Sequence, residues 1–368
     1  MNAVNPDAND IKVSVCMITY NHERFIAQAI ESVLMQETDF RVELVIGEDC
    51  STDGTRAIVR EFGERFPERI RLLLPEHNLG MMPNFVATLS ACRGQYVALL
   101  EGDDYWTDPH KLQKQVEFLE AHPECSMCFH DVMVVYEDHQ HEPHRYCSPD
   151  QKRFSTLEDL LERNFIPTCS VVYRRGLVDE LPPWYFEMPM GDWPLHVLHA
   201  QHGTIGYVNE VMSVYRKHPG GVYSQSDKLT WLDGVFDMYA ALNAHFAGQY
   251  HEKIIAGLSR VCEYFFTETA RKQSQPMAPD QVNHLLINLF SRQPDKLTIP
   301  FLTQQQIKAK CTIAVGFTYF QSSNLHEARR FMLNAIFHDT RWLRNRGVLK
   351  ILLGLRKPDS YVITSPTA

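Results

Sequence analysis

Short apolar runs alternate with amphipathic stretches through the first part of the chain. The runs at residues 13–19, 42–46, 70–74 and 96–100 carry few charged side chains, which is typical of strands buried on both faces of a parallel sheet. Between these runs, apolar residues recur at helical spacing. Because strands and helices alternate, we expect an α/β fold: a doubly wound, mainly parallel sheet with right-handed crossovers, flanked by helices.

Further strands are predicted at residues 167–173, 205–208 and 210–215, and the pattern changes near residue 225. Beyond it strand signals almost vanish, and amphipathic helical patterns run through residues 231–246, 254–269, 281–290 and 314–337. A chain of 368 residues is long enough to form two domains. We therefore predict an α/β domain over residues 1–225 and an all-α domain over residues 226–368.

Acidic residues follow the apolar run at residues 96–100. Glu101, Asp103 and Asp104 lie within four residues, and Gly102 allows the backbone to turn tightly between them. Three crowded carboxylates repel one another unless a divalent cation neutralises them, and hard oxygen ligands suit Mn²⁺ or Mg²⁺. In open α/β sheets, ligands bind at this end of the strands. The alternative is an acidic surface turn without a ligand.

Asp192 is an acid among bulky apolar residues, next to Trp193 and Pro194. A carboxylate in such surroundings tends to have a raised pKa, which suits a general base. The other interpretation is that Asp192 is the N-cap of a helix that has Pro194 near its start. The two interpretations are compatible.

Composition narrows the class of protein. The net charge of −9 argues against general nucleic-acid binding, which needs a basic surface. Nine cysteines are scattered, several of them within apolar runs, as expected for reduced thiols in a core. The sequence has no secretory signal pattern and no apolar run near the ~20 residues that span a bilayer. We expect a cytoplasmic protein.

Six motifs along residues 11–220 occur in an order that resembles the cytoplasmic family 2 glycosyltransferases of bacterial glycan assembly, which are inverting enzymes with the GT-A fold. They are Val15-Cys16-Met17-Ile18-Thr19-Tyr20-Asn21, Glu48-Asp49-Cys50-Ser51-Thr52-Asp53-Gly54-Thr55, Asn78-Leu79-Gly80, Glu101-Gly102-Asp103-Asp104, Gly191-Asp192-Trp193 and Tyr215-Arg216-Lys217-His218. Each motif is weak by itself, whereas six in order are specific.

The resemblance implies a role for each matching residue. The nucleotide of a UDP-sugar donor would be held by a group of residues with Asp49 at the uracil edge: Thr19, Tyr20, Asn21, Asp49, Asn78 and Gly80. Its diphosphate would be bound through Mn²⁺ or Mg²⁺ at the family's DxD position, with a late histidine completing the metal shell: Glu101, Asp103, Asp104 and His218. Arg216 and Lys217 would stabilise the diphosphate, and Asp192 would be the catalytic base. Glu101 departs from the family, which usually has aspartate there.

This resemblance predicts a metal-dependent transferase that moves a hexosyl or N-acetylhexosaminyl group to a glycan or lipid-linked glycan. One alternative is a sugar-nucleotidyltransferase, although those enzymes have a glycine-rich basic loop where this chain has Asn21-His22-Glu23-Arg24. The other is an inactive nucleotide-sugar-binding scaffold.

Residues 341–357 form the most basic stretch, with six cations interleaved with apolar residues. Such a segment suits the headgroup layer at the inner face of a membrane. The alternative is that its apolar side packs on the preceding helices.

Overall fold

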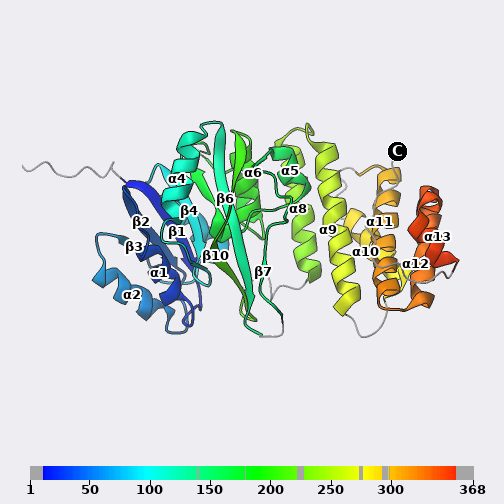
Figure 1. The fold of residues 1–368 in the computed structure, drawn as a ribbon, viewed down its shortest axis with the longest axis horizontal. Coiled ribbons are helices and arrows are strands. Elements are labelled where there is room, and N and C mark those ends of the chain that lie inside the picture. The colour runs from blue at the N-terminus through cyan, green and yellow to red at the C-terminus, as the bar shows by residue number, and fades with distance from the viewer. Residues whose placement is uncertain are drawn as a thin grey trace, which may run out of the picture. The chain divides into compact units, whose positions relative to one another are not determined.

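The computed structural model describes residues 11–138, 141–178, 180–221, 228–272, 277–291, 297 and 299–353 (Figure 1). The chain divides into two compact units. One consists of Met1–Leu160 with Asn164–Ser226, and the other of Leu161–Arg163 with Asp227–Ala368. The first contains the sheet and the second consists of helices.

The described strands of the first unit form one ten-stranded sheet. Its main path, in order across the sheet, is β3 (Ile70–Leu73), β2 (Arg41–Glu48), β1 (Ile11–Thr19), β4 (Tyr96–Glu101), β9 (Val172–Arg174), β6 (Cys125–Tyr136), β10 (Thr204–Lys217) and β5 (Tyr105–Trp106). Two short strands lie off this path: β7 (His144–Arg145) pairs with β6, and β8 (Phe154–Ser155) pairs with β10.

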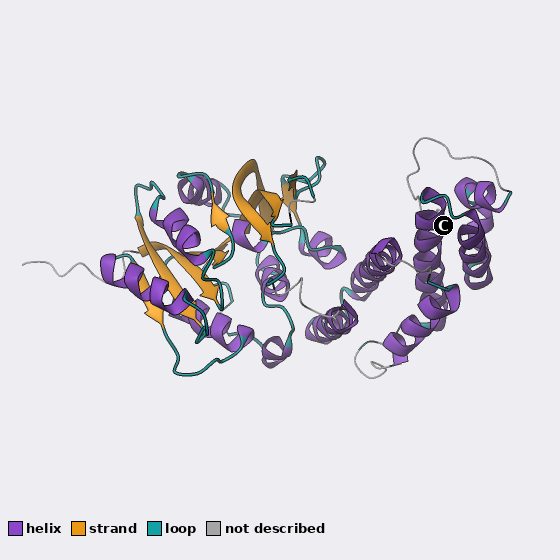
Figure 2. Cartoon of the chain, turned by 90° about the horizontal axis from the view of Figure 1, so that it is seen from below, coloured by secondary structure: helices purple, strands orange, loops and turns teal. Residues whose placement is uncertain are grey.

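Neighbouring strands are parallel from β3 to β4 and again between β6 and β10. β9 runs antiparallel to both β4 and β6. Helices lie on both sides of the sheet (Figure 2). They are α1 (Ile26–Leu34), α2 (Thr55–Arg65), α3 (Met81–Ala91), α4 (Lys111–Ala121), α5 (Leu157–Glu162) and α6 (Asp192–Ala200). This arrangement confirms the predicted mainly parallel sheet flanked by helices.

Two predictions for this unit need correction. The apolar run at residues 167–173 is not one strand, because it begins as the 3₁₀ helix η1 (Thr168–Ser170). Pro167 starts it, and the Ser170 hydroxyl donates to the Pro167 carbonyl at 2.6 Å, a local bond that competes with strand pairing. The two strand segments expected between residues 205 and 215 are one strand, β10, with irregular register between Val208 and Val211.

The second unit is all-helical in its described residues, as predicted. Its elements are α8 (Lys228–His245), α9 (His251–Lys272), α10 (Pro279–Ser291), α11 (Phe301–Gln321), α12 (Leu325–His338), η3 (Thr340–Arg344) and α13 (Arg346–Leu352). None of the described helices combines enough length with enough apolar side chains to cross a bilayer.

The basic stretch at residues 341–357 divides its apolar side chains between the interior and the surface. Trp342, Val348 and Ile351 are buried, whereas Leu343 and Leu353 are exposed. The interior residues support the packing alternative, and the exposed leucines leave a surface for the membrane hypothesis. Residues 354–357 lie outside the described residues.

Candidate functional site

The site lies where β1, β2 and β4 end side by side. Thr19 of β1 is opposite Glu48 of β2, and Ile18 is opposite Glu101 of β4. Because the three strands are parallel, the loops that leave them meet at one edge of the sheet. These loops carry most of the predicted site residues.

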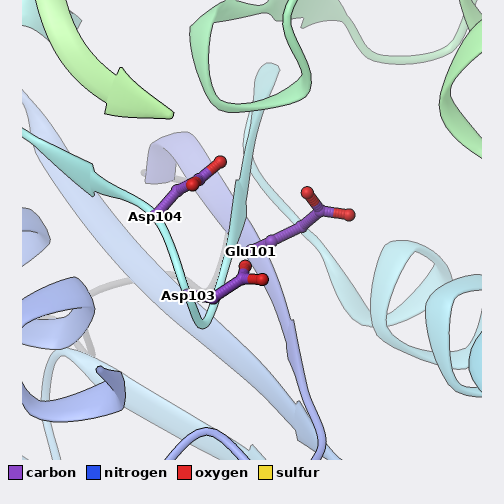
Figure 3. A group of neighbouring side chains, drawn as sticks. All are labelled: Glu101, Asp103 and Asp104. Carbon is purple, nitrogen blue, oxygen red and sulfur yellow. The ribbon is translucent and has the colours of Figure 1, made fainter. Parts of the chain in front are cut away.

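Glu101, Asp103 and Asp104 converge at this edge. Figure 3 shows their side chains around the end of β4 and the turn that follows it. One carboxylate oxygen from each lies within 4.8 Å of the other two. Gly102 is required, because a Cβ at this position would lie 2.5 Å from the Thr19 hydroxyl oxygen and 2.7 Å from its Cβ. We call Glu101–Asp104 the acid turn.

The acid turn brings three acidic groups together, with Glu101 and Asp103 partly buried and Asp104 buried. Burial raises the pKa of the Glu101 carboxyl well above its ordinary value, and the carboxylates of Asp103 and Asp104 raise it further. Burial, followed by the charge of Asp103, likewise raises the pKa of Asp104. The Asp104 Oδ1 atom accepts a hydrogen bond of 2.7 Å from the Arg216 amide. Its Oδ2 atom is buried without a hydrogen-bond partner in the described structure. The carboxylate oxygens of the acid turn are the kind of ligand that a hard divalent ion prefers.

Two histidines lie close to Asp103. The Nε2 atom of His218 lies 3.1 Å from Asp103 Oδ2, and that of His22 lies 3.7 Å from the same oxygen. Burial by itself would raise the pKa of Asp103, but the hydrogen bond with His218 and the nearby His22 outweigh it and lower that pKa. The structure thus brings His218, one of the expected metal ligands, next to Asp103. Sequence reasoning missed His22, and its position three residues after the end of β1 was the available signal.

Arg216 and Lys217 lie in different surroundings. The Arg216 guanidinium donates to the Asp103 carbonyl and, at 2.7 Å, to Gln28, and it lies 4.8 Å from the ring centres of both Phe25 and Tyr105. Successive side chains of a strand point to opposite faces, and the Lys217 ammonium lies over the Tyr136 ring at 5.4 Å. The structure therefore brings Arg216, and not the Lys217 ammonium, to the acid turn.

Asp49 holds a neighbouring loop. Its carboxylate oxygens accept hydrogen bonds of 2.7 and 3.0 Å from the Leu79 and Gly80 amides, and the Asn78 side chain donates to the Asp49 carbonyl at 2.8 Å. Gly80 has φ +89°, which favours glycine. The structure thus gives the Asp49 carboxylate a loop-binding role, in addition to the uracil contact expected for it.

The end of β1 and the loop after it carry the other predicted nucleotide residues. Asn21 has φ 56°, and its side-chain oxygen accepts from the Thr52 amide at 2.8 Å. Thr19 is buried, and its hydroxyl lies 3.2 Å from His22 Nδ1. The Tyr20 ring is 43% exposed, so it is available to a ligand.

Asp192 is the first residue of α6, and the N-cap is Gly191. The N-cap interpretation was therefore wrong by one residue, and Asp192 makes no side-chain capping bond. Its Oδ2 atom instead accepts a hydrogen bond of 2.8 Å from the Thr168 hydroxyl. The charge of Asp192 also contributes to the raised pKa of Glu101, so it acts electrostatically on the acid turn.

Comparison with known proteins gives a consistent result. The family model described as glycosyl transferase family 2 matches residues 14–181. A putative teichuronic acid biosynthesis glycosyltransferase of Bacillus subtilis, TuaG, is 30% identical over 224 residues, which are 60% of this chain and 85% of TuaG.

Other similar proteins extend the match. An uncharacterised protein of Mycobacterium tuberculosis is 44% identical over 215 residues, or 57% of this chain, and this chain covers only 60% of that relative's length. The crystal structure of residues 1–349 of S. aureus TarS in complex with UDP-GlcNAc has a TM-score of 0.61 at 17% identity, and the match covers 90% of this chain and 92% of that 1–349 chain. This last likeness concerns the fold.

The two amide bonds to Asp49 generate a stability prediction. Asp49→Ala removes the acceptor of the Leu79 amide and one of the two acceptors of the Gly80 amide, which also donates to Asn78, and a hydrogen bond contributes about 0.5–1.5 kcal/mol. We expect a lower free energy of unfolding in urea titration. Glu76→Ala is the control, because Glu76 is an exposed acid of the loop that Asp49 holds. Equal stability of the Asp49 variant and the unchanged protein would show that the loop does not depend on Asp49.

Proposed function

Because the chain belongs to glycosyl transferase family 2, we propose that it is a glycosyltransferase that moves a sugar from a UDP-sugar to a hydroxyl of a glycan or lipid-linked glycan, with inversion and with a divalent ion. The convergence of three carboxylates at the end of β4, with Asp192 in electrostatic reach, carries this proposal. Family membership disfavours the sugar-nucleotidyltransferase and scaffold alternatives.

The donor is assigned to the edge formed by β1, β2 and β4, in the domain of residues 1–225. Tyr20 offers an exposed ring to the nucleotide, with Thr19, Asn21 and the loop held by Asp49 around it. Asp103 and Asp104, with Glu101 and His218 beside them, would hold Mn²⁺ or Mg²⁺. The ion, when bound, supplies positive charge to the diphosphate as it leaves. Arg216 adds a fixed cation next to the same turn.

Asp192 is assigned as the general base. Thr168 fixes its Oδ2 atom by a hydrogen bond of 2.8 Å, so Oδ1 is the oxygen that we assign to the acceptor proton. The acceptor oxygen loses its proton to Asp192 and attacks the anomeric carbon, while the bond from that carbon to the diphosphate breaks. This single displacement inverts the anomeric centre. We assign acceptor binding to the helical domain of residues 226–368.

For a lipid-linked acceptor, we assign membrane contact to the basic stretch at residues 341–357. Exposed Leu343 and Leu353 accompany the exposed cations Arg344 and Arg346, a combination that suits an anionic headgroup layer.

The first prediction concerns the acid turn. Asp104→Asn preserves the shape of the side chain but removes its charge, so we expect UDP affinity in the presence of Mn²⁺ to fall at least ~10-fold, the scale of lost metal-site groups. Isothermal titration of UDP with and without Mn²⁺ measures this effect. Asp108→Asn is the matched control, because Asp108 pairs with Lys114 at 2.7 Å outside the acid turn. Unchanged affinity in the Asp104 variant would contradict the assignment.

The second prediction concerns the base. Asp192→Asn should lower turnover by about 10²-fold or more, because a positioned base contributes on that scale, and should leave Mn²⁺–UDP affinity unchanged. Release of UDP from UDP-GlcNAc, the sugar nucleotide bound in the TarS complex, measures turnover. Glu187→Gln, at a nearby exposed acid, controls for charge. Normal turnover of the Asp192 variant would place the base elsewhere.

The third prediction concerns membrane contact. We expect the chain to sediment with vesicles of anionic lipid at low salt and to be released as salt rises. The double variant Arg344→Glu/Arg346→Glu should weaken sedimentation, whereas Arg60→Glu/Arg65→Glu, an equal charge change at exposed positions of α2, should not. If the unchanged protein stays in the supernatant at low salt, the stretch is only structural.

A further inference from the structure

One short segment, η1, connects the acid turn with the proposed base. Its first residue, Thr168, donates to Asp192 Oδ2 at 2.8 Å. The carbonyl of the next residue, Cys169, accepts a hydrogen bond of 2.9 Å from the indole nitrogen of Trp106. Trp106 lies two residues beyond Asp104 in the chain. A continuous path of contacts therefore leads from Asp104 to Asp192.

Trp106 is held firmly at the start of this path. It is 1% exposed and pairs with Ser213 in the antiparallel ladder of β5 and β10. Hydrogen bonds flank this ladder on both sides: the Arg216 amide donates to Asp104 Oδ1, and the Thr107 amide donates to the Met212 carbonyl at 2.9 Å. A shift of the indole is thus coupled to a shift of the acid turn.

Helix α4 supports both Trp106 and η1. Its first residue, Lys111, has no exposed surface, and its ammonium nitrogen lies 4.0 Å from the centre of the Trp106 ring. Among the described residues it has no hydrogen-bond partner. One turn later, the Gln115 amide nitrogen donates to the Ser170 carbonyl at 2.9 Å. Two neighbouring carbonyls of η1 are thus held, one by Trp106 and one by α4.

The burial of Lys111 needs an explanation. An amine removed from water without a hydrogen bond destabilises the fold, and burial lowers its pKa to about 7. Methionine has a similar length and would fill the same space without this cost. What lysine adds is its interaction with the face of the indole, which depends on ring orientation.

We propose that Trp106 and Lys111 are positioning residues that set the distance between the acid turn and Asp192. They touch neither donor nor acceptor and act through η1 and Thr168. This inference rests on the proposed function, because it takes Asp192 as the base. Catalysis is sensitive to such placement, since an error of about 1 Å can cost about 10²-fold in rate.

Two substitutions test the proposal separately. Trp106→Phe keeps a ring for Lys111 but removes the donor to Cys169, and Lys111→Met keeps the apolar stem but removes the charge. We expect each to lower turnover of UDP-GlcNAc with Mn²⁺ by roughly 10-fold, with the Kd of Mn²⁺–UDP within about twofold of the unchanged protein, and Lys111→Arg to restore part of the rate. Trp342→Phe and Lys308→Met, at buried positions of the helical unit, are the controls. They should leave turnover unchanged, because hydrolysis of UDP-GlcNAc involves neither a glycan acceptor nor a membrane.

A double-mutant cycle then distinguishes positioning from general destabilisation. Thr168→Val removes the hydroxyl that holds Asp192. If Trp106 acts through Thr168, Trp106→Phe should cost little further rate in the Thr168→Val background, because coupled residues are not additive. Fully additive losses in the logarithm of the rate would overturn the proposal, as would equal losses in the control variants.

If UDP-GlcNAc is not hydrolysed, that result counts against the proposed function and not against the positioning role. Hydrogen exchange then tests the positioning role without turnover. The amides of Ser170 and Val171 bond to the carbonyls of Pro167 and Thr168, so their hydrogen exchange reports on η1. Trp106→Phe and Lys111→Met should accelerate this exchange, and Trp342→Phe should not. Unchanged exchange in both variants of the first pair would overturn the positioning role.

Discussion

The repulsion among three carboxylates at the end of β4 is the constraint on which the site depends. Glu101 and Asp104 have raised pKa values because burial and their acidic neighbours disfavour their charged forms. The fold keeps these groups together with fixed partners, which include the Arg216 amide on Asp104 and His218 on Asp103. The turn therefore favours ligands that bring positive charge.

The same constraint explains why the surrounding elements are closely connected. The acid turn leads directly into β5, which pairs with β10, and β10 brings Arg216 back to the turn. Trp106 of β5 donates a hydrogen bond to the Cys169 carbonyl of η1. Thr168, in the same segment, donates a hydrogen bond to Asp192. The groups assigned to the donor and to the acceptor proton thus come from distant parts of the sequence and are connected through β5, β10 and η1.

The local features of this site could be predicted from the sequence. The apolar runs identify the parallel strands, because a strand that is buried on both faces consists mainly of apolar residues. The acid turn directly follows one of these runs. The helical half was equally visible from its periodicity. What sequence reasoning missed depends on long-range contacts. The periodicity of residues 167–173 could not show η1, the identity of His22 could not show that it faces Asp103, and the side of β10 to which Lys217 points depends on register.

The proposed role of the acid turn is to bind the donor's diphosphate through a divalent ion. A crystal structure with UDP and Mn²⁺, with anomalous diffraction data collected at the manganese edge, shows whether the ion is bound there. We expect one anomalous peak in direct contact with the carboxylates of Asp103 and Asp104 and with the diphosphate. A nucleotide bound at this edge of the sheet with no manganese peak at the acid turn would contradict it.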